Sequence, residues 1–121
     1  MNKKRILIVD DDSRNIFALS ATLRSRAFEC VSFPDARQAL DYLEKDEPVD
    51  AILMDMMMPE MDGYEAIPQI RKIDKRRDTC IIAVTAQAMV GDKEKCLEAG
   101  ADDYVSKPID VNKLVSLLSG I

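Results

Sequence analysis

Short apolar runs alternate along this chain with segments whose apolar residues recur every three or four positions. The runs are four to seven residues long and mostly continuous, as in strands that are buried on both faces of a parallel sheet. The predicted strands are Ile6–Val9, Phe28–Phe33, Ala51–Asp55, Thr79–Thr85 and Asp103–Ser106. Because a helical segment follows each run, the pattern predicts five strand–helix units with short connections.

Capping residues mark the starts of the predicted helices. Ser13 is expected to cap the first helix, Asp35 the second and Asp110 the last. The third is predicted from Asp62-Gly63 to about Ile73, and the fourth from Gly91 to Ala99. The inward-facing apolar positions are Ile16, Leu19 and Leu23, then Ala36, Ala39, Leu40 and Leu43, then Ile67 and Ile70, and finally Val111, Leu114, Val115 and Leu118.

The order of these elements predicts the fold class. Right-handed crossovers place helices on both faces of a parallel sheet, so we expect a doubly wound α/β domain. Pro68 falls inside the third predicted helix, where it predicts either a kink or a late start.

Length and composition indicate one globular domain spanning residues 1–121. Hydrophobic residues make up 47% of the chain and charged residues 32%, and the formal net charge is −5. This acidity argues against direct nucleic-acid binding, because no basic stripe offsets it. The cluster Lys72, Lys75, Arg76 and Arg77 is interpreted as a solvated helix end and loop.

Several classes of protein are excluded or disfavoured. No apolar run approaches the roughly 20 residues that a membrane span needs, and the run after the basic segment Met1–Arg5 ends at Val9, which is too short for a signal peptide. We therefore expect a cytoplasmic protein without membrane contact. Cys30, Cys80 and Cys96 form no metal-binding or redox motif and are expected to be reduced and mostly buried.

The chain contains no histidine. It therefore has no Ser-His or Cys-His nucleophile pair, no His-ligated zinc and no His general base. If the protein handles phosphoryl groups through a histidine, that histidine belongs to another polypeptide or to another domain.

The ends of four predicted strands carry groups that bind cations or phosphoryl oxygens. These groups are Asp10, Asp11 and Asp12 after the first strand, Asp55 at the end of the third, Thr85 at the end of the fourth and Lys107 after the fifth. Ligands of open α/β sheets bind just outside the carboxyl ends of the strands. The set therefore predicts one crevice with several carboxylates, a hydroxyl and an ammonium group.

Neighbouring carboxylates repel one another, and a Mg²⁺ ion would relieve that repulsion through the oxygen ligands it prefers. Asp10, Asp11 and Asp55 are the predicted ligands, with Asp11 preferred over Asp10 for direct coordination. The backbone carbonyl of Met57 is a further candidate. Asp55 is also a plausible nucleophile, because carboxylates form acyl phosphates, with Lys107 contacting the transferred group.

The chain resembles the response-regulator receiver domains from about Lys4 to Leu118. The segments that carry the resemblance are Ile6-Leu-Ile-Val-Asp-Asp-Asp12, Ile52-Leu-Met-Asp-Met-Met-Met-Pro-Glu-Met-Asp-Gly63, Ala83-Val-Thr-Ala86 and Gly100-Ala-Asp-Asp-Tyr-Val-Ser-Lys-Pro108. The resemblance implies a flavodoxin-like five-stranded sheet of order 2-1-3-4-5. It also implies Asp55 as phosphoacceptor, Mg²⁺ held by Asp10 and Asp11, and Thr85 and Tyr104 as a switch pair. Lys107 would contact the phosphoryl group, and the Lys107-Pro108 bond would be cis.

The resemblance further implies a signalling phosphoacceptor rather than an enzyme, although one that assists its own phosphorylation and dephosphorylation. Expected partners are a histidine kinase or a histidine phosphotransfer protein as donor, and a downstream protein or a missing output domain as receiver of the signal. Details such as Asp12-Ser-Arg-Asn15 and Met56-Met57-Met58 look most like receivers that work with hybrid histidine kinases. Met57 and Gln87 would border the path of a hydrolytic water, which predicts slow-to-moderate self-dephosphorylation.

Phosphorylation is expected to act on the face built from the fourth helix, the fifth strand and the fifth helix. In this hypothesis Thr85 moves toward the phosphoryl group and Tyr104 turns inward, a population shift between two conformers. The residues expected to border the face are Ala88, Met89, Lys93, Tyr104 and Val105.

Other interpretations of the same motifs are weaker. Asp10-x-Asp12 fits the opening of a haloacid dehalogenase-type phosphatase, but that interpretation leaves Asp55 without a role. An EF-hand-like loop starting at Asp11 would have Ile16 where glycine is needed. A receiver-like interaction module without phosphorylation is a third alternative. Asp12 is expected to lie at the rim of the site or to help cap the first helix.

Overall fold

Five parallel strands form the centre of the protein in the order β2-β1-β3-β4-β5, as the sequence predicts. The structure, a computed structural model, describes residues 3–86 and 90–121. The strands are β1 (Arg5–Val9), β2 (Glu29–Phe33), β3 (Ala51–Asp55), β4 (Cys80–Thr85) and β5 (Asp103–Ser106). The helices are α1 (Ser13–Ser25), α2 (Ala36–Leu43), α3 (Gly63–Arg71), α4 (Asp92–Ala99) and α5 (Val111–Ser119), with a short 3₁₀ turn η1 (Asp74–Arg76).

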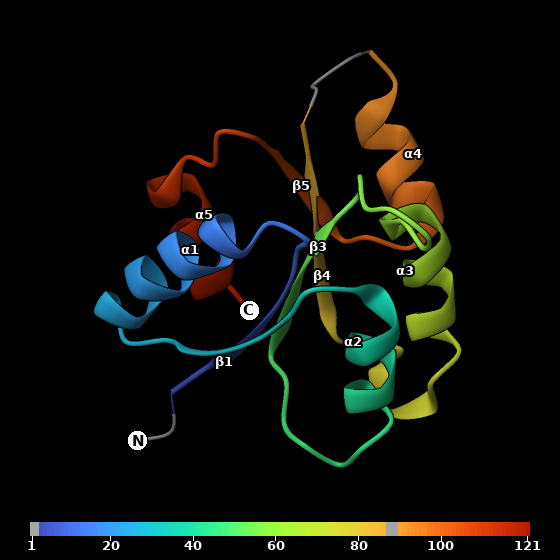
Figure 1. The fold of residues 1–121 in the computed structure, drawn as a ribbon, viewed down its shortest axis with the longest axis horizontal. Coiled ribbons are helices and arrows are strands. Elements are labelled where there is room, and N and C mark those ends of the chain that lie inside the picture. Colours follow the sequence, from blue (N-terminus) through green and yellow to red (C-terminus); the bar gives the residue numbers. More distant parts are fainter. Residues whose placement is uncertain (1–2, 87–89) are drawn as a thin grey trace.

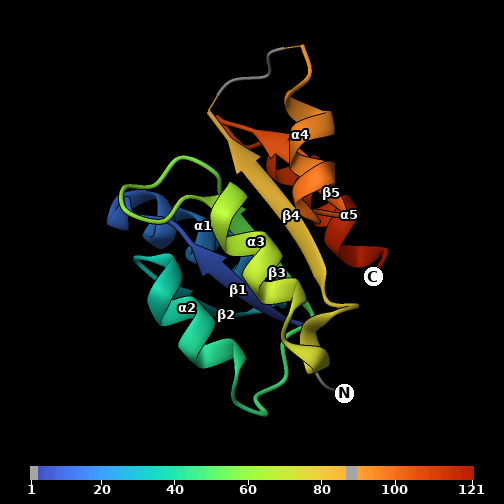
Figure 2. The same ribbon diagram turned by 90° about the vertical axis from the view of Figure 1, so that its right-hand side faces the viewer.

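Helices cover both faces of the sheet, α1 and α5 on one and α2, α3 and α4 on the other (Figures 1 and 2). The side chains of a strand alternate between the two faces. In β1, Leu7 and Val9 join the core under α2, α3 and α4, whereas Ile6 and Ile8 join the core under α1 and α5. Both faces are buried, which explains why the strands appear in the sequence as continuous apolar runs.

Two predicted helix boundaries differ from the structure. Asp12, not Ser13, caps α1: its backbone is extended, and its side chain accepts a hydrogen bond of 2.9 Å from the N–H of Arg14. Both residue types are good caps, so the sequence could not choose between them. Helix α3 ends at Arg71 instead of Ile73, because Ile73 has an extended backbone and caps η1.

Pro68 lies inside α3. The late start proposed from the sequence is wrong, since the helix begins at Gly63 with Asp62 as its cap. Asp35 and Asp110 cap α2 and α5 as predicted.

The interpretation of the basic cluster as wholly solvated is wrong for Arg76, which is only 5% exposed. Its guanidinium donates to the carbonyls of Leu43, Lys45 and Glu47 at 2.8–2.9 Å. Arginine has five N–H donors in a fixed fork, so one side chain can serve several carbonyls at the end of a helix. Arg76 thus fastens η1 to the end of α2 and the loop after it.

Cys96 is buried, Cys30 and Cys80 are partly buried, and all three are free thiols. Among the described residues, no helix is both long and apolar enough to cross a bilayer.

Candidate functional site

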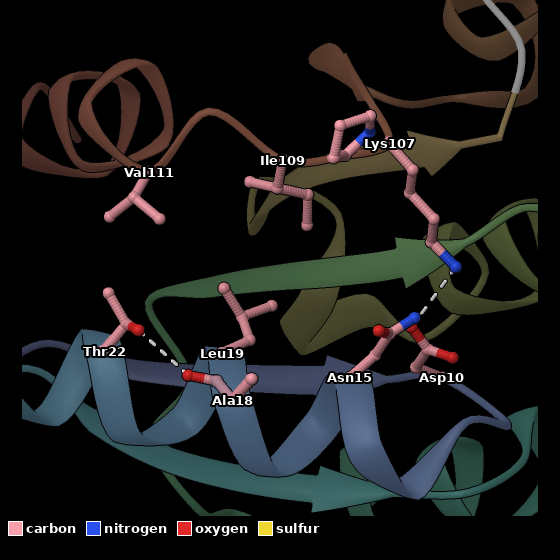
Figure 3. A pocket seen from close by; sticks show the side chains of 9 residues that line it. Asp10, Asn15, Ala18, Leu19, Thr22, Lys107, Ile109 and Val111 are labelled. Atoms are coloured by element: carbon pink, nitrogen blue, oxygen red, sulfur yellow. Dashed lines mark hydrogen bonds and ion pairs between the residues drawn. The ribbon is translucent and has the colours of Figure 1, made fainter.

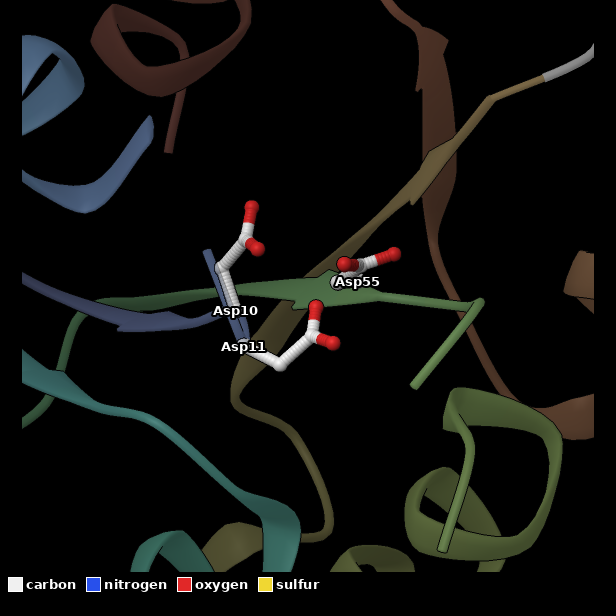
Figure 4. A group of neighbouring side chains, drawn as sticks. All are labelled: Asp10, Asp11 and Asp55. Atoms are coloured by element: carbon white, nitrogen blue, oxygen red, sulfur yellow. The ribbon is translucent and has the colours of Figure 1, made fainter. Parts of the chain in front are cut away.

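The carboxyl ends of the strands bring together most of the side chains selected from the sequence. By the alternation along β1 and β3, Asp10 and Asp55 continue the rows that face α1 and α5. The reactive oxygens of Asp10, Asp11 and Asp55 all lie within 4.8 Å of one another (Figure 4). Asp55 and Asp10 are 2% and 7% exposed, whereas Asp11 is exposed to solvent. The preferred direct ligand from the sequence is therefore the most accessible member of the cluster.

Lys107 supplies a positive charge in the site. Its Nζ lies 3.4 Å from Oδ2 of Asp55 and 3.5 Å from Oδ2 of Asp10, and Figure 3 shows its side chain extending toward Asp10. The Lys107-Pro108 peptide is cis, as the resemblance implied. Burial alone would lower the pKa of Lys107, but the Asp55 and Asp10 carboxylates together raise it above its usual value.

The surroundings of Asp55 raise the pKa of its carboxyl group. Burial raises its pKa and the Asp10 carboxylate adds to the rise, while the N–H of Met57 and the Lys107 ammonium oppose it. The N–H of Met57 donates to Oδ1 of Asp55 at 2.9 Å, and Lys107 approaches Oδ2. Lys107 pairs with two of the three carboxylates, so among the described side chains the cluster keeps an excess of negative charge.

Gly63 allows the loop after Asp55 to fold back closely onto the end of β3. A Cβ at this position would lie 2.9 Å from Cα of Met56, closer than real Cβ atoms come to a backbone, and 3.1 Å from the carbonyl oxygen of Asp55, which is closer than most Cβ contacts. The sequence indicated Gly63 only as part of a helix start. The structure adds that a residue without a side chain is needed at this position, next to the backbone of Asp55.

Thr85 and Tyr104 come from neighbouring strands. Thr85 ends β4 and is 5% exposed. Tyr104 pairs with Ala83 in the ladder and is partly buried against the core beneath α2, α3 and α4. The two residues of the expected switch therefore lie on adjacent strands, toward the carboxyl ends of both.

The other residues expected near the site or on the output face have different positions in the structure. Gln87, Ala88 and Met89 lie outside the described residues. Val105 does not border the expected output face, because it is 3% exposed and packs into the core beneath α1 and α5. Lys93 lies in the first turn of α4.

A groove of about 500 Å³ beside the carboxylates was not foreseen from the sequence. It runs between α1 and the segment that joins β5 to α5, with Asp10 and Lys107 at its inner end (Figure 3). Asn15 and Thr22 contribute polar groups, and Leu19 and Ile109 apolar ones. The sequence offered one weak indication of this groove: Asn15 follows the three aspartates by less than one helical turn. That spacing is equally typical of a residue exposed to solvent.

The profile of the response regulator receiver domain matches residues 6–119. The chain belongs to this family. It is thus a receiver domain of two-component signalling, with the five-stranded fold expected of one.

Similar proteins include receivers within much longer kinases. The chain is 39% identical over 125 residues to hybrid signal transduction histidine kinase I of Dictyostelium discoideum, covering 98% of this chain. It is 40% identical over 113 residues to the histidine-protein kinase BarA of Escherichia coli (strain K12), covering 93% of this chain. The chain spans 7% and 12% of the length of these two proteins. The predicted likeness to receivers associated with hybrid histidine kinases is confirmed.

Many solved structures have the same fold. The receiver domain of the sensor histidine kinase PA1611 of Pseudomonas aeruginosa, with a magnesium ion coordinated in its active site cleft, matches with a TM-score of 0.89 at 39% identity over 98% of this chain and 97% of that one. A chain in the co-crystal structure of the phosphotransfer protein Ypd1 and the receiver domain of Ssk1, from Saccharomyces cerevisiae, matches with a TM-score of 0.88 at 28% identity over 97% of this chain and 87% of that one.

The family assignment and the geometry exclude two alternative interpretations. Asp12 lies outside the carboxylate cluster and caps α1, so Asp10-x-Asp12 is not a phosphatase motif. Helix α1 begins at Ser13, so the segment after Asp11 is helical and cannot form an EF-hand loop.

Proposed function

We propose that residues 1–121 act as one phosphoacceptor receiver domain in which Asp55 takes a phosphoryl group from a phosphohistidine. One observation supports this most strongly: Asp55 is buried at the end of β3 while its two oxygens face different partners, the Met57 N–H and the Lys107 ammonium. A carboxylate held in this way keeps one orientation toward an incoming phosphorus atom. The cytoplasmic location predicted from the sequence is part of the proposal.

The cluster fits a divalent cation. Three carboxylates with oxygens within 4.8 Å of one another, opposed by a single lysine, are a hard oxygen donor set with excess negative charge. Mg²⁺ prefers such ligands and shares its coordination with substrate phosphates and water. Asp10, Asp11 and Asp55 would hold the ion, with the Met57 carbonyl as a further ligand. The magnesium ion in the cleft of the PA1611 receiver supports the same assignment. When bound, the ion neutralises negative charge on the carboxylates and on the phosphoryl oxygens.

The residues of the chain would act as follows. An oxygen of Asp55 attacks phosphorus as the bond to the donor imidazole breaks, giving an acyl phosphate and a histidine that leaves neutral because its other ring nitrogen carries a proton. Lys107, already beside Asp55, shifts to a phosphoryl oxygen and balances charge that spreads over the equatorial oxygens. The Thr85 hydroxyl donates a hydrogen bond to another of these oxygens. Hydrolysis of the acyl phosphate, at a rate influenced by Met57 and Gln87, returns the domain to its resting form.

The chain has no histidine, so the donor histidine belongs to another polypeptide or to another domain, and the expected donor is a histidine kinase or a histidine phosphotransfer protein. The likeness to a chain of the Ypd1–Ssk1 complex supports a donor of this kind. The signal would leave through the face formed by α4, β5 and α5, toward a downstream protein or an output domain, with Thr85 and Tyr104 as the switch pair. A Tyr104→Ala variant that is phosphorylated normally should lose the phosphorylation dependence of partner binding.

Intact-mass measurement after incubation with acetyl phosphate tests the proposal. The wild type should gain one phosphoryl group in the presence of Mg²⁺ and none with a chelator, and Asp55→Asn should gain none. Asp12→Asn is the matched control, since it replaces a nearby aspartate outside the cluster by an equally good cap. A phosphorylated Asp55→Asn, or a wild type that gains no phosphoryl group, would contradict the proposal.

A further inference from the structure

Five methionines lie close together in the sequence, one within β3 and four between β3 and α3, but their exposure differs sharply. Met54, Met56 and Met58 are at most 8% exposed, and Met61 is partly buried. Met57 is 66% exposed. Among the described methionines, Met57 is therefore the one whose side chain is largely in water.

The sulfur atoms of the neighbours Met56 and Met61, in contrast, contact other parts of the protein. The sulfur of Met56 is packed against the position where Gly63 lacks a side chain. The sulfur of Met61 accepts a hydrogen bond of 3.7 Å from the side-chain amide of Gln69. Susceptibility of methionine to oxidation follows exposure, so a dissolved oxidant should reach Met57 before these residues.

The backbone of Met57 is fixed beside Asp55 by its N–H, which donates to Oδ1 of that carboxylate at 2.9 Å. The side chain thus starts next to the buried carboxylate and extends into solvent. A chemical change at its sulfur would occur at the mouth of the site without altering the backbone hydrogen bond.

We propose that Met57 is a site of reversible oxidation by peroxides, and that its sulfoxide shortens the lifetime of the phosphoryl group on Asp55. The second half of this inference rests on the proposed function. Peroxide would thus regulate the domain by a route that does not involve the phosphohistidine donor.

The modification step is a two-electron oxidation of the thioether. The Met57 sulfur attacks one oxygen of hydrogen peroxide, the O–O bond breaks as the S–O bond forms, and the other oxygen leaves as water after proton transfer. Sulfur is oxidised and the peroxide is reduced. Sulfoxide reductases reverse the step, with two thiols supplying the electrons as they form a disulfide and the sulfoxide oxygen leaving as water.

The sulfoxide changes the polarity of the water path to Asp55. A thioether sulfur is a weak hydrogen-bond acceptor, whereas a sulfoxide oxygen is a strong one. Placed at the mouth of the site, it can hold a water molecule close to the acyl phosphate. One added hydrogen bond to the reacting water corresponds to a rate increase of about fivefold.

The first part of the experiment locates the oxidation. The protein is treated with dilute hydrogen peroxide, sampled over time and mapped by peptide mass spectrometry. The Met57 sulfoxide should accumulate faster than the Met61 sulfoxide and much faster than those of Met54, Met56 and Met58. Equal or slower oxidation of Met57 relative to Met61 would overturn the assignment of the site, whether or not the protein accepts phosphoryl groups.

The second part measures the loss of the phosphoryl group from protein phosphorylated with acetyl phosphate, in the oxidised and reduced forms of each variant. Wild type and Met61→Leu should lose it about fivefold faster when oxidised, and treatment with methionine sulfoxide reductase should restore the slow rate. Met57→Leu should give the same rate in both forms. An unchanged wild-type rate, or an effect that persists in Met57→Leu, would overturn the regulatory role. A protein that takes up no phosphoryl group would refute the proposed function and this role together, while the oxidation map would still decide whether Met57 is the modified residue.

Discussion

The Lys107 ammonium group lies 3.4 Å from Oδ2 of Asp55, although 52 positions separate the two residues in the chain. The parallel sheet creates this contact, because β3 and β5 flank β4 and all three end at the same edge. The same ammonium also faces Asp10. A single lysine therefore connects the ends of the first, third and fifth strands.

Replacing Lys107 by alanine should slow phosphoryl uptake from acetyl phosphate about a hundredfold, which is typical of losing one preorganised donor to a developing charge. Lys113→Ala removes an exposed lysine from α5 and is the control. Rates are read from intact mass over time. Similar rates for the two variants would mean that Lys107 has no role in the transfer.

Magnesium should stabilise the fold through the carboxylate cluster. At a concentration of one hundred times its dissociation constant, a ligand that binds only the folded state adds about 2.7 kcal/mol, and for a domain of this size the thermal midpoint should rise by about 10 °C. Asp11→Asn should abolish most of this rise, whereas Asp12→Asn should keep it. Thermal scanning with and without Mg²⁺ measures the rise of the midpoint. Equal rises in the two variants would argue against the proposed ligands.

The stability of the metal-free protein should depend on the ionisation of Asp55. Because burial raises the pKa of Asp55, the folded protein holds this proton more tightly than the unfolded chain does. The resulting stability is complete below the ordinary aspartate pKa and is lost as the pH rises through the raised value. Asp55→Asn carries no such charge, so with a chelator present it should be more stable than wild type at pH 7. Urea denaturation should show this advantage disappearing below about pH 4. An advantage that is independent of pH would point to a packing effect instead.

The strand ends show which parts of the fold and site can be predicted from sequence. A continuous apolar run that stops on Asp55 is a local pattern, and parallel topology then places all such ends together, so the carboxylates and Lys107 follow from the sequence. The cap of α1 does not, because Asp12 and Ser13 have similar propensities and only the backbone conformation decides between them. The burial of Arg76 could not be predicted from the sequence either. Its neighbours Lys75 and Arg77 are exposed, and its burial depends on carbonyls about 30 positions away that no local pattern reveals.

Arg76 should contribute strongly to stability. Arg76→Ala removes three charge-assisted hydrogen bonds and leaves the carbonyls of Leu43, Lys45 and Glu47 without these donors. We expect a loss of about 3 kcal/mol or more, measured by urea denaturation. Arg77→Ala, which replaces the exposed neighbour, should change stability by less than about 0.5 kcal/mol. A small effect of Arg76→Ala would show that water replaces the guanidinium without loss.

We propose that Asp55, and not one of the neighbouring aspartates, becomes an acyl phosphate. Borohydride reduces an acyl phosphate to an alcohol and so converts a phosphorylated aspartate to homoserine. Peptide sequencing by mass spectrometry, after phosphorylation with acetyl phosphate and Mg²⁺ and then reduction, identifies the residue directly. We expect homoserine at position 55 and unchanged aspartates at positions 10, 11 and 12. Homoserine at any of those three positions, or at none of the four, would contradict it.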